Sequence, residues 1–185
     1  MNTGVVSRRY AKALLAYAKA AKKEDKVYQE VRTLAGYFDR VAGLRHAVEN
    51  PVLDIQTKLK LLREAAGGKS VSNELMRFFS LVLEEKREKF LQFMTWSYID
   101  LYREDKNILI GKLTTAVPSP KLEAYLTKVL SEKNGNATIE LETKVDPNLI
   151  GGYVVEVAGR RMDASVSNQL QRIEQQFIAK NRRII

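Results

Sequence analysis

The chain has no cysteine and a single histidine among its 185 residues, and both shortages exclude chemistry. Without cysteine there is no disulfide framework, no thiolate nucleophile and no cysteine-based metal site. With only His46, metal ligation by several histidines is excluded, and any nucleophile–base arrangement would depend on that one side chain. His46 stands shortly before Asn50-Pro51 with no motif around it, so a surface or capping histidine is the simpler interpretation.

Long apolar runs are also missing. No stretch approaches the roughly 20 apolar residues that a membrane-spanning helix needs. Residues Met1 to Val6 have neither the apolar core nor the small-residue cleavage site of a secretory signal. We therefore expect a cytoplasmic protein without direct membrane insertion. Because Met1 is closely followed by the first predicted helix, a bacterial origin is favoured over a mitochondrial chain freed of its transit peptide.

The chain is basic, with a net charge of +9, which raises the question of nucleic-acid binding. The excess is +5 over residues 1–105 and +4 over residues 106–185, and acidic residues are interleaved throughout. A nucleic-acid-binding domain more often concentrates its charge on one stripe or helix. A solvated surface with a general attraction to acidic partners fits this distribution better. A small basic nucleic-acid-binding adaptor remains the alternative function.

Two motifs suggest catalysis and fail on inspection. Gly67-Gly68-Lys69-Ser70 ends like a P-loop, but the pattern needs glycine five residues before Gly68, where Arg63 stands. The loop also follows a predicted helix instead of a buried strand. The carboxylates of Glu84-Glu85 and Glu88 are separated by basic residues, as in a charge-paired turn. We therefore expect no catalytic, cofactor or metal site. A hydrolase or transferase ranks third among the candidate functions, because a nucleophile–base arrangement is missing.

The spacing of apolar residues predicts a mainly α fold in two parts. Residues 1–105 read as a bundle of five to six helices, with Asp54 and Ser72 as N-caps and with Gly43 and Gly67-Gly68 as stops. The last helix carries Phe90, Met94, Ser97 and Leu101 at helical spacing.

From Asn107 the period changes, and residues 106–185 read as a small α/β domain with a short mixed sheet. We expect strands at 108–117, 138–142 and 153–157, with a turn at Ala158-Gly159 after the last of them. Asp163 or Ser165 can cap the final helix. Pro147 and Gly151-Gly152 should set the shape of the loop before the third strand.

The first helix has more apolar surface than packing requires. Its apolar residues fill about half of the helix circumference. They are Val6, Tyr10, Ala13, Leu14, Tyr17, Ala18 and Ala21. Because packing against one neighbour needs a narrower stripe, part of this arc is expected to face a partner.

Three segments resemble a known family. They are Arg9-Tyr10-Ala11-Lys12-Ala13-Leu14, Phe78-Phe79-Ser80-Leu81-Val82-Leu83-Glu84-Glu85, and the region from Val145 through Gly151-Gly152 to Leu170. In this order they resemble the delta subunit family of F-type ATP synthase, called the oligomycin-sensitivity-conferring protein in mitochondria. The chain departs from the family at Ala164, where glycine is frequent, and near Lys86-Arg87, where Asn-Gly is frequent.

The resemblance implies a non-catalytic subunit of the peripheral stalk, present once per complex on the cytoplasmic face of the bacterial inner membrane. The N-terminal bundle would bind the N-terminal segments of the alpha subunits in a groove between its first and fifth helices. The residues at the matching positions are Tyr10, Ala13, Leu14, Tyr17, Leu75, Phe78, Phe79 and Val82. Each of them fits a place in the bundle core equally well.

The C-terminal domain would bind the b subunits. The apolar stripe of the last helix is the predicted contact, although most of it is expected to pack on the small sheet. This stripe consists of Val166, Leu170, Ile173 and Phe177.

Overall fold

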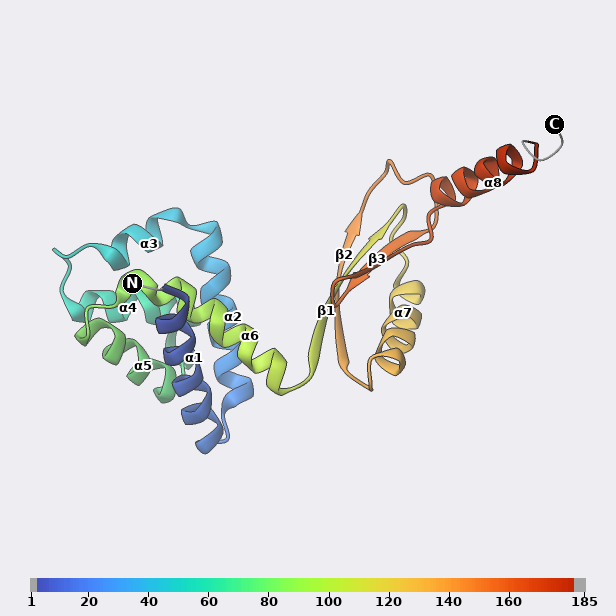
Figure 1. Ribbon diagram of the computed structural model, residues 1–185. Helices are drawn as coiled ribbons and strands as arrows, with labels where there is room; N and C mark the ends of the chain where they lie inside the picture. Colours follow the sequence, from blue (N-terminus) through green and yellow to red (C-terminus); the bar gives the residue numbers. More distant parts are fainter. Residues whose placement is uncertain (1–2, 182–185) are drawn as a thin grey trace. The chain divides into compact units, whose positions relative to one another are not determined.

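The computed structural model describes residues 3–181, and the chain divides into two compact units, Met1–Asp105 and Lys106–Ile185 (Figure 1). The first unit is helical, and the second combines a mixed four-stranded sheet with helices. The predicted fold class, mainly α with a small α/β part, is confirmed.

The N-terminal unit consists of six α-helices and two short 3-10 turns within the described residues. They are α1 (Thr3–Ala20), α2 (Glu24–Arg40), α3 (Ala42–Glu49), α4 (Ile55–Ala66), η1 (Gly68–Ser70), α5 (Asn73–Glu84), η2 (Glu88–Phe90) and α6 (Leu91–Asp105). The predicted caps are confirmed. The Asp54 carboxylate accepts a hydrogen bond from Thr57 N at the start of α4, and Ser72 Oγ accepts one from Leu75 N at the start of α5. Gly67 ends α4 with φ at 130°.

Two sequence predictions in this unit are wrong. Gly43 does not stop α2: Val41 leaves the helical conformation first, with φ at −118° and ψ at 87°, and Gly43 lies inside α3. The buried face of α6 is also rotated from the predicted stripe. It consists of Leu91, Met94, Thr95, Tyr98, Ile99 and Tyr102. The predicted stripe contained neither Tyr98 nor Tyr102.

The α6 tyrosines are buried because their hydroxyls find partners on α2. Tyr102 donates to Asp25 Oδ1 at 2.6 Å, and its ring stacks on Tyr28 with centroids 4.1 Å apart. Tyr98 is fully buried and reaches the carbonyl of Glu24 at 3.5 Å. Burial raises the pKa of both phenols well above the ordinary value, so they stay neutral donors. This contact holds the C-terminal half of α6 against the first turn of α2.

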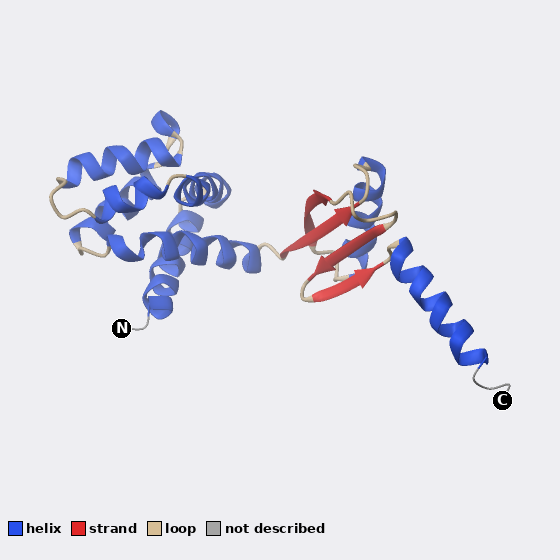
Figure 2. Ribbon diagram, turned by 90° about the horizontal axis from the view of Figure 1, so that it is seen from above, coloured by secondary structure: helices blue, strands red, loops and turns tan. Residues whose placement is uncertain are grey.

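The C-terminal unit is a β–α–β crossover followed by a hairpin and a helix. Its elements are β1 (Ile108–Thr115), α7 (Pro120–Lys133), β2 (Thr138–Val145), β3 (Tyr153–Val157), β4 (Arg160–Asp163) and α8 (Val166–Asn181). The strand order is β2-β1-β3-β4, with β1 and β2 parallel and the other pairs antiparallel. Helix α7 covers one face of the sheet (Figure 2). The core beneath it contains Leu113, Leu126, Ala137, Ile139, Val155 and Val157.

Glycine and a tight turn shape the sheet and its connections. At Ala158-Gly159, φ values of 50° and 73° give the reversal that the sequence predicted between β3 and β4. Gly152 has φ of 79°, and a Cβ there would lie 2.3 Å from the Ala164 carbonyl oxygen. Gly151 accepts a hydrogen bond from Val166 N at 3.0 Å, so the predicted loop glycines do set the chain path, beside the start of α8.

Gly111 in the middle of β1 makes the tightest approach in the sheet. A Cβ at this position would lie 2.5 Å from Leu141 Cδ2 and 2.6 Å from Val157 Cγ2, so the two neighbouring strands already fill its space. Gly111→Ala should therefore lower the free energy of unfolding by about 1–3 kcal/mol, because the core is overpacked. Urea unfolding followed by circular dichroism measures this. Lys112→Ala on the open face is the control and should cost less than about 1 kcal/mol; equal losses for both variants would contradict the prediction.

Candidate functional site

A groove lies between α1 and α5 in the N-terminal unit. Its volume is about 380 Å³. The lining residues are Val5, Val6, Arg9, Tyr10 and Ala13 from α1, Leu81 from α5, and Arg87 just beyond α5. The floor is apolar, and the two arginines lie at its rim.

The groove is built around Tyr10. Its ring meets Phe78 edge to face, with centroids 6.5 Å apart and an interplanar angle of 68°. The Arg87 guanidinium lies 5.4 Å from the Tyr10 ring centroid, within cation–π range. Further along, Arg77 donates to the Tyr17 hydroxyl at 2.9 Å. These contacts show that α1 and α5 run antiparallel, with the groove along their seam.

The eight residues predicted for this groove separate into two sets. Tyr10 is half-buried, Ala13 is exposed, and Tyr17 is 40% exposed. Phe78 is 8% exposed and supports Tyr10 from beneath. The other four are buried in the bundle core, so a partner could reach them only if the helices separated. They are Leu14, Leu75, Phe79 and Val82.

Sequence reasoning missed part of the lining. Val5 is 64% exposed and Leu81 is 48% exposed. The predicted groove residues Leu14 and Val82, on the same two helices, are only 4% and 0% exposed. Val5 extends the apolar arc of α1 by one position, which was a usable signal. Leu81 precedes the fully buried Val82, so it points about 100° away from the core. Arg9 and Arg87 were noted only as part of sequence motifs.

Buried polar contacts fix the start of α5 and so the geometry of the groove. Glu30 on α2 is 7% exposed and accepts hydrogen bonds from Ser72 N at 2.9 Å and from Ser72 Oγ at 2.5 Å. Glu74 in the first turn of α5 accepts from Lys23 Nζ at 3.0 and 3.2 Å. The hydrogen bond from Lys23 and a backbone hydrogen bond hold the pKa of Glu74 below its ordinary value.

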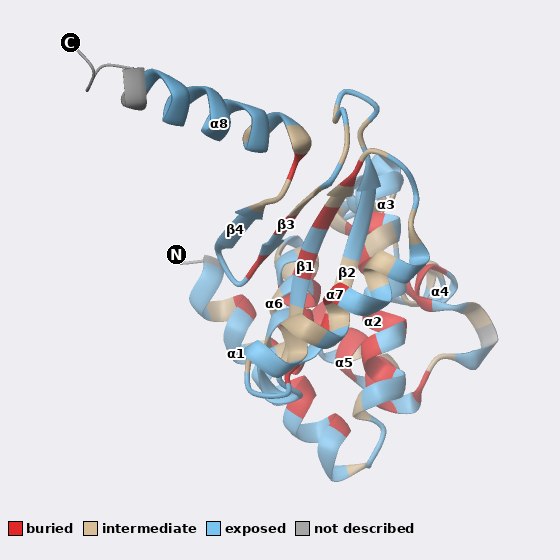
Figure 3. Ribbon diagram, turned by 90° about the vertical axis from the view of Figure 1, so that its right-hand side faces the viewer, coloured by how far each residue is buried: buried red, intermediate tan, exposed pale blue. Residues whose placement is uncertain are grey.

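A second apolar surface follows the last helix, and we call it the α8 stripe: Leu170, Ile173, Phe177 and Ile178. These side chains are exposed by 56%, 50%, 66% and 49%. Figure 3 shows α8 coloured as exposed along most of its described length. The expectation that most of this helix face packs on the sheet is wrong, because only Val166 at the first turn is half-buried there. The helix is capped as predicted, since Ser165 Oγ accepts from Asn168 N at 3.2 Å. Hydrogen bonds from Ser165 lower the pKa of Asp163 beside this cap.

The structure offers no cluster of side chains for metal chemistry within residues 3–181. No group of three or more metal-ligating side chains occurs in that range. The Gly67-to-Ser70 segment follows helix α4, so the strand that a P-loop requires is absent. Glu88 is held by buried Lys58 at 2.8 Å. Burial raises the pKa of Glu88 and the Lys58 hydrogen bond lowers it, and the net shift is downward, as in a structural ion pair.

No helix in the described part of the chain combines the length and apolar character needed to cross a bilayer.

Comparison with known proteins identifies the family. The model of the ATP synthase delta (OSCP) subunit matches residues 6–177. ATP synthase subunit delta of Phocaeicola vulgatus is 56% identical over 185 residues, with both chains covered completely. The Bacteroides fragilis subunit delta is 45% identical over 186 residues, again with complete coverage.

The chain belongs to the ATP synthase delta (OSCP) subunit family. The resemblance read from the sequence is thereby confirmed. A chain of the Toxoplasma gondii mitochondrial ATP synthase hexamer is similar with a TM-score of 0.63, covering 93% of this chain and 97% of that one. At 22% identity this likeness shows that the fold is shared.

The Lys23–Glu74 contact predicts a pH dependence in this family member. Because the pKa of Glu74 is lowered on folding, its contribution is complete above the unfolded-state value of about 4.5 and is lost as the pH falls further. At neutral pH, Glu74→Gln should cost about 1 kcal/mol, since Lys23 is half exposed and screened.

The measurement is thermal unfolding of both proteins between about pH 7 and pH 3, the range in which a carboxyl of this kind titrates. The difference in melting temperature should shrink below pH 4.5. Glu84→Gln, an exposed carboxyl at the end of α5, is the control and should follow wild type throughout. A Glu74→Gln deficit that stays constant down to the lowest pH would contradict the assignment.

Proposed function

We propose that this chain is a non-catalytic peripheral-stalk subunit of an F-type ATP synthase. It links the catalytic head to the b subunits, so that proton-driven rotation of the rotor is coupled to ATP synthesis. Family membership and full-length similarity to subunits delta support this role. The single observation that carries it is the open apolar groove between α1 and α5.

The groove is the proposed binding site for the N-terminal segments of the alpha subunits. An amphipathic helix binds by inserting apolar residues at i, i+3, i+4 and i+7 into such a seam. Tyr10 and Leu81 supply apolar walls on the two sides. Arg9 and Arg87 at the rim favour a segment that carries acidic side chains flanking its apolar face.

The α8 stripe is the proposed contact for the b subunits. Four large apolar side chains lie exposed on one helix, and nothing within the described residues covers them. Pairing with a partner helix would bury them. Attachment through both surfaces would place the chain, as one copy per complex, on the cytoplasmic face of the inner membrane without inserting it into the bilayer.

Nucleic-acid binding is less well supported. The basic residues are distributed over both units, and the two accessible surfaces described above are apolar at their centres. A binding site for phosphates would instead depend on a concentrated basic stripe.

The groove is tested with a synthetic peptide copying an alpha-subunit N-terminal segment from the same organism. Tyr10→Asp and Leu81→Asp should each weaken binding by about tenfold or more, because a charge replaces an apolar anchor. Both side chains are partly accessible, so the fold should survive. The dissociation constants are measured by isothermal titration calorimetry, with circular dichroism and melting checked for each variant.

Tyr37→Asp provides the matched control, because Tyr37 is 46% exposed on α2, away from the groove. It should bind the peptide like wild type. Affinity should fall only mildly between low and moderate salt, whereas a steep logarithmic slope would favour phosphate binding instead. Unchanged affinity in folded Tyr10→Asp and Leu81→Asp proteins would refute the groove assignment.

The α8 stripe is tested by the double substitution Leu170→Asp and Phe177→Asp. Because both side chains are mostly exposed, melting should hardly change, while binding of a soluble b-subunit fragment should fall by about tenfold or more. Gln175→Asp, on the opposite side of α8, should keep full binding. Analytical ultracentrifugation of the mixtures reports the complex, and wild-type binding by the double variant would remove α8 from the interface.

A further inference from the structure

The outer edge of strand β2 is unpaired within the described residues. β2 is 8 residues long and lies at the end of the sheet, with β1 as its only neighbour there. Long regular edges are usually shortened, bulged, interrupted by proline or covered, because their backbone groups recruit other strands. β2 contains no proline, and its register with β1 is unbroken from Thr138 to Val145.

The pairing with β1 shows which backbone groups face outward. Thr138 N donates to the Asn107 carbonyl at 3.1 Å, and Asp146 N donates to the Thr115 carbonyl at 2.9 Å. Since backbone groups alternate along a strand, the even-numbered residues of β2 bond to β1. The N–H and C=O groups on the outer edge therefore belong to Ile139, Leu141, Thr143 and Val145.

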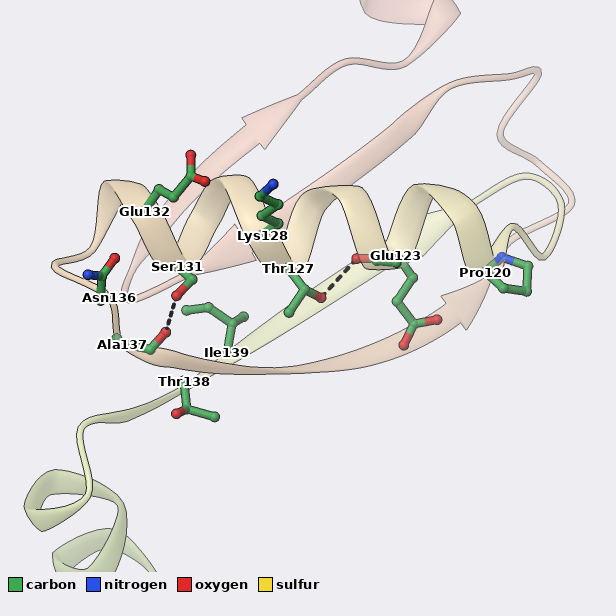
Figure 4. A pocket seen from close by; sticks show the side chains of 11 residues that line it. Pro120, Glu123, Thr127, Lys128, Ser131, Glu132, Asn136, Ala137, Thr138 and Ile139 are labelled. Carbon is green, nitrogen blue, oxygen red and sulfur yellow. Dashed lines mark hydrogen bonds between the residues drawn. The ribbon is translucent and has the colours of Figure 1, made fainter.

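A cleft lies beside this edge, between β2 and α7 (Figure 4). Its volume is about 720 Å³. Small side chains form much of its wall, among them Ala124, Thr127, Ser131 and Ala137. Two of their polar atoms are already satisfied, because Thr127 Oγ1 donates to the Glu123 carbonyl and Ser131 Oγ donates to the Ala137 carbonyl. The cleft can thus accept small apolar side chains from a strand added next to β2.

The open face of the sheet carries a row of alternating charge. Across the four strands, Arg161 on β4 is in register with Glu156 on β3, Glu156 with Lys112 on β1, and Lys112 with Glu142 on β2. Opposite charges on neighbouring strands stabilise their pairing. The row ends on an acidic residue at the free edge, and Glu140 lies on the same face two residues before it. The next strand in this row would be stabilised by basic residues.

We propose that the β2 edge accepts a fifth strand from a partner chain: an extended segment with basic residues at alternate positions and small apolar residues between them. Its backbone would bond to the outward groups of Ile139, Leu141, Thr143 and Val145. One of its basic side chains would lie beside Glu142, and its apolar ones would enter the α7 cleft. Backbone bonds supply affinity in this mode, and alternate side chains supply specificity.

The test uses the full-length protein and three synthetic peptides of the same length as β2. In the first, lysine alternates with valine; in the second, glutamate replaces every lysine. The third is the lysine peptide with methylated backbone nitrogens on the edge that would face β2. The lysine peptide should bind saturably and slow amide exchange at residues 139, 141, 143 and 145, measured by NMR. The other two should bind at least about tenfold more weakly.

Two substitutions test the same edge from the protein side. Thr143→Pro removes an outward N–H without breaking a bond to β1. It should lower the affinity for the lysine peptide by about tenfold, whereas Thr143→Ser should leave that affinity unchanged. Glu142→Lys should reverse the preference in favour of the glutamate peptide. Glu156→Lys, the same change on an inner strand, should leave the preference for lysine intact.

Several outcomes would overturn the proposal. They are absence of saturable binding, equal affinity for the methylated and unmethylated peptides, and equal affinity of the Thr143→Pro and Thr143→Ser proteins. Dimerisation of the protein alone, if abolished by Thr143→Pro, would assign the edge to a second copy instead. The methylated peptide keeps the test decisive with wild-type protein even if Thr143→Pro does not fold. These results are independent of the alpha-subunit groove and of α8.

Discussion

A helix can bury only the face that its neighbours cover, and α1 has more apolar surface than that face. Ala11, Leu14, Leu15 and Ala18 pack into the bundle and are at most 8% exposed. The remaining apolar surface, from Val5 through Tyr10 to Tyr17, stays accessible along the seam with α5. Burying an apolar side chain stabilises by about 1.5–3 kcal/mol, so a partner that covered this seam would gain binding free energy. The proposed attachment to the catalytic head depends on it.

The seam is useful only if α5 is held rigidly beside α1. Glu30, buried on α2, accepts both the backbone and the hydroxyl hydrogen of Ser72, while Lys23 binds Glu74 two residues later. Removing the Glu30 carboxylate would leave the buried donors of Ser72 unpaired, which is costly. In the proposed role as a stalk subunit, this arrangement would matter, because a groove that shifts under load would lose its contacts one at a time. The polar contacts position the groove, and the apolar surface is the proposed binding site.

Local signals were sufficient where one residue decides the geometry. Asp54, Ser72 and Ser165 cap helices, and Ala158-Gly159 turns the chain, because these side chains or φ values act within a few residues. Prediction failed where the answer depends on distant partners. Tyr98 and Tyr102 were not part of the predicted α6 stripe, yet Asp25 and the Glu24 carbonyl make their burial favourable. The α8 stripe looked like core because its pattern is the same whether the covering surface is in this chain or in another.

The sequence predicted where the candidate site lies but not which of its side chains are accessible. The excess apolar arc of α1 indicated a shared surface, but the sequence could not show that Leu14 and Phe79 are buried while Val5 and Leu81 are exposed. That distinction depends on how far α1 and α5 are rotated against their neighbours. The free edge of β2 could not be predicted from the sequence, because strand order depends on pairing between distant segments. Only the assembled sheet places Glu142 at the end of the charge row.

Both units contain binding groups that have no partner among residues 3–181. The N-terminal unit leaves an apolar seam, and the C-terminal unit leaves an apolar helix face and an unpaired strand edge. These features bind by different physics, since helix burial tolerates rotation about the helix axis, whereas backbone pairing fixes register and direction. A connection that must transmit torque benefits from having both. The helical contacts would supply most of the binding free energy, and the strand edge would prevent slippage along them.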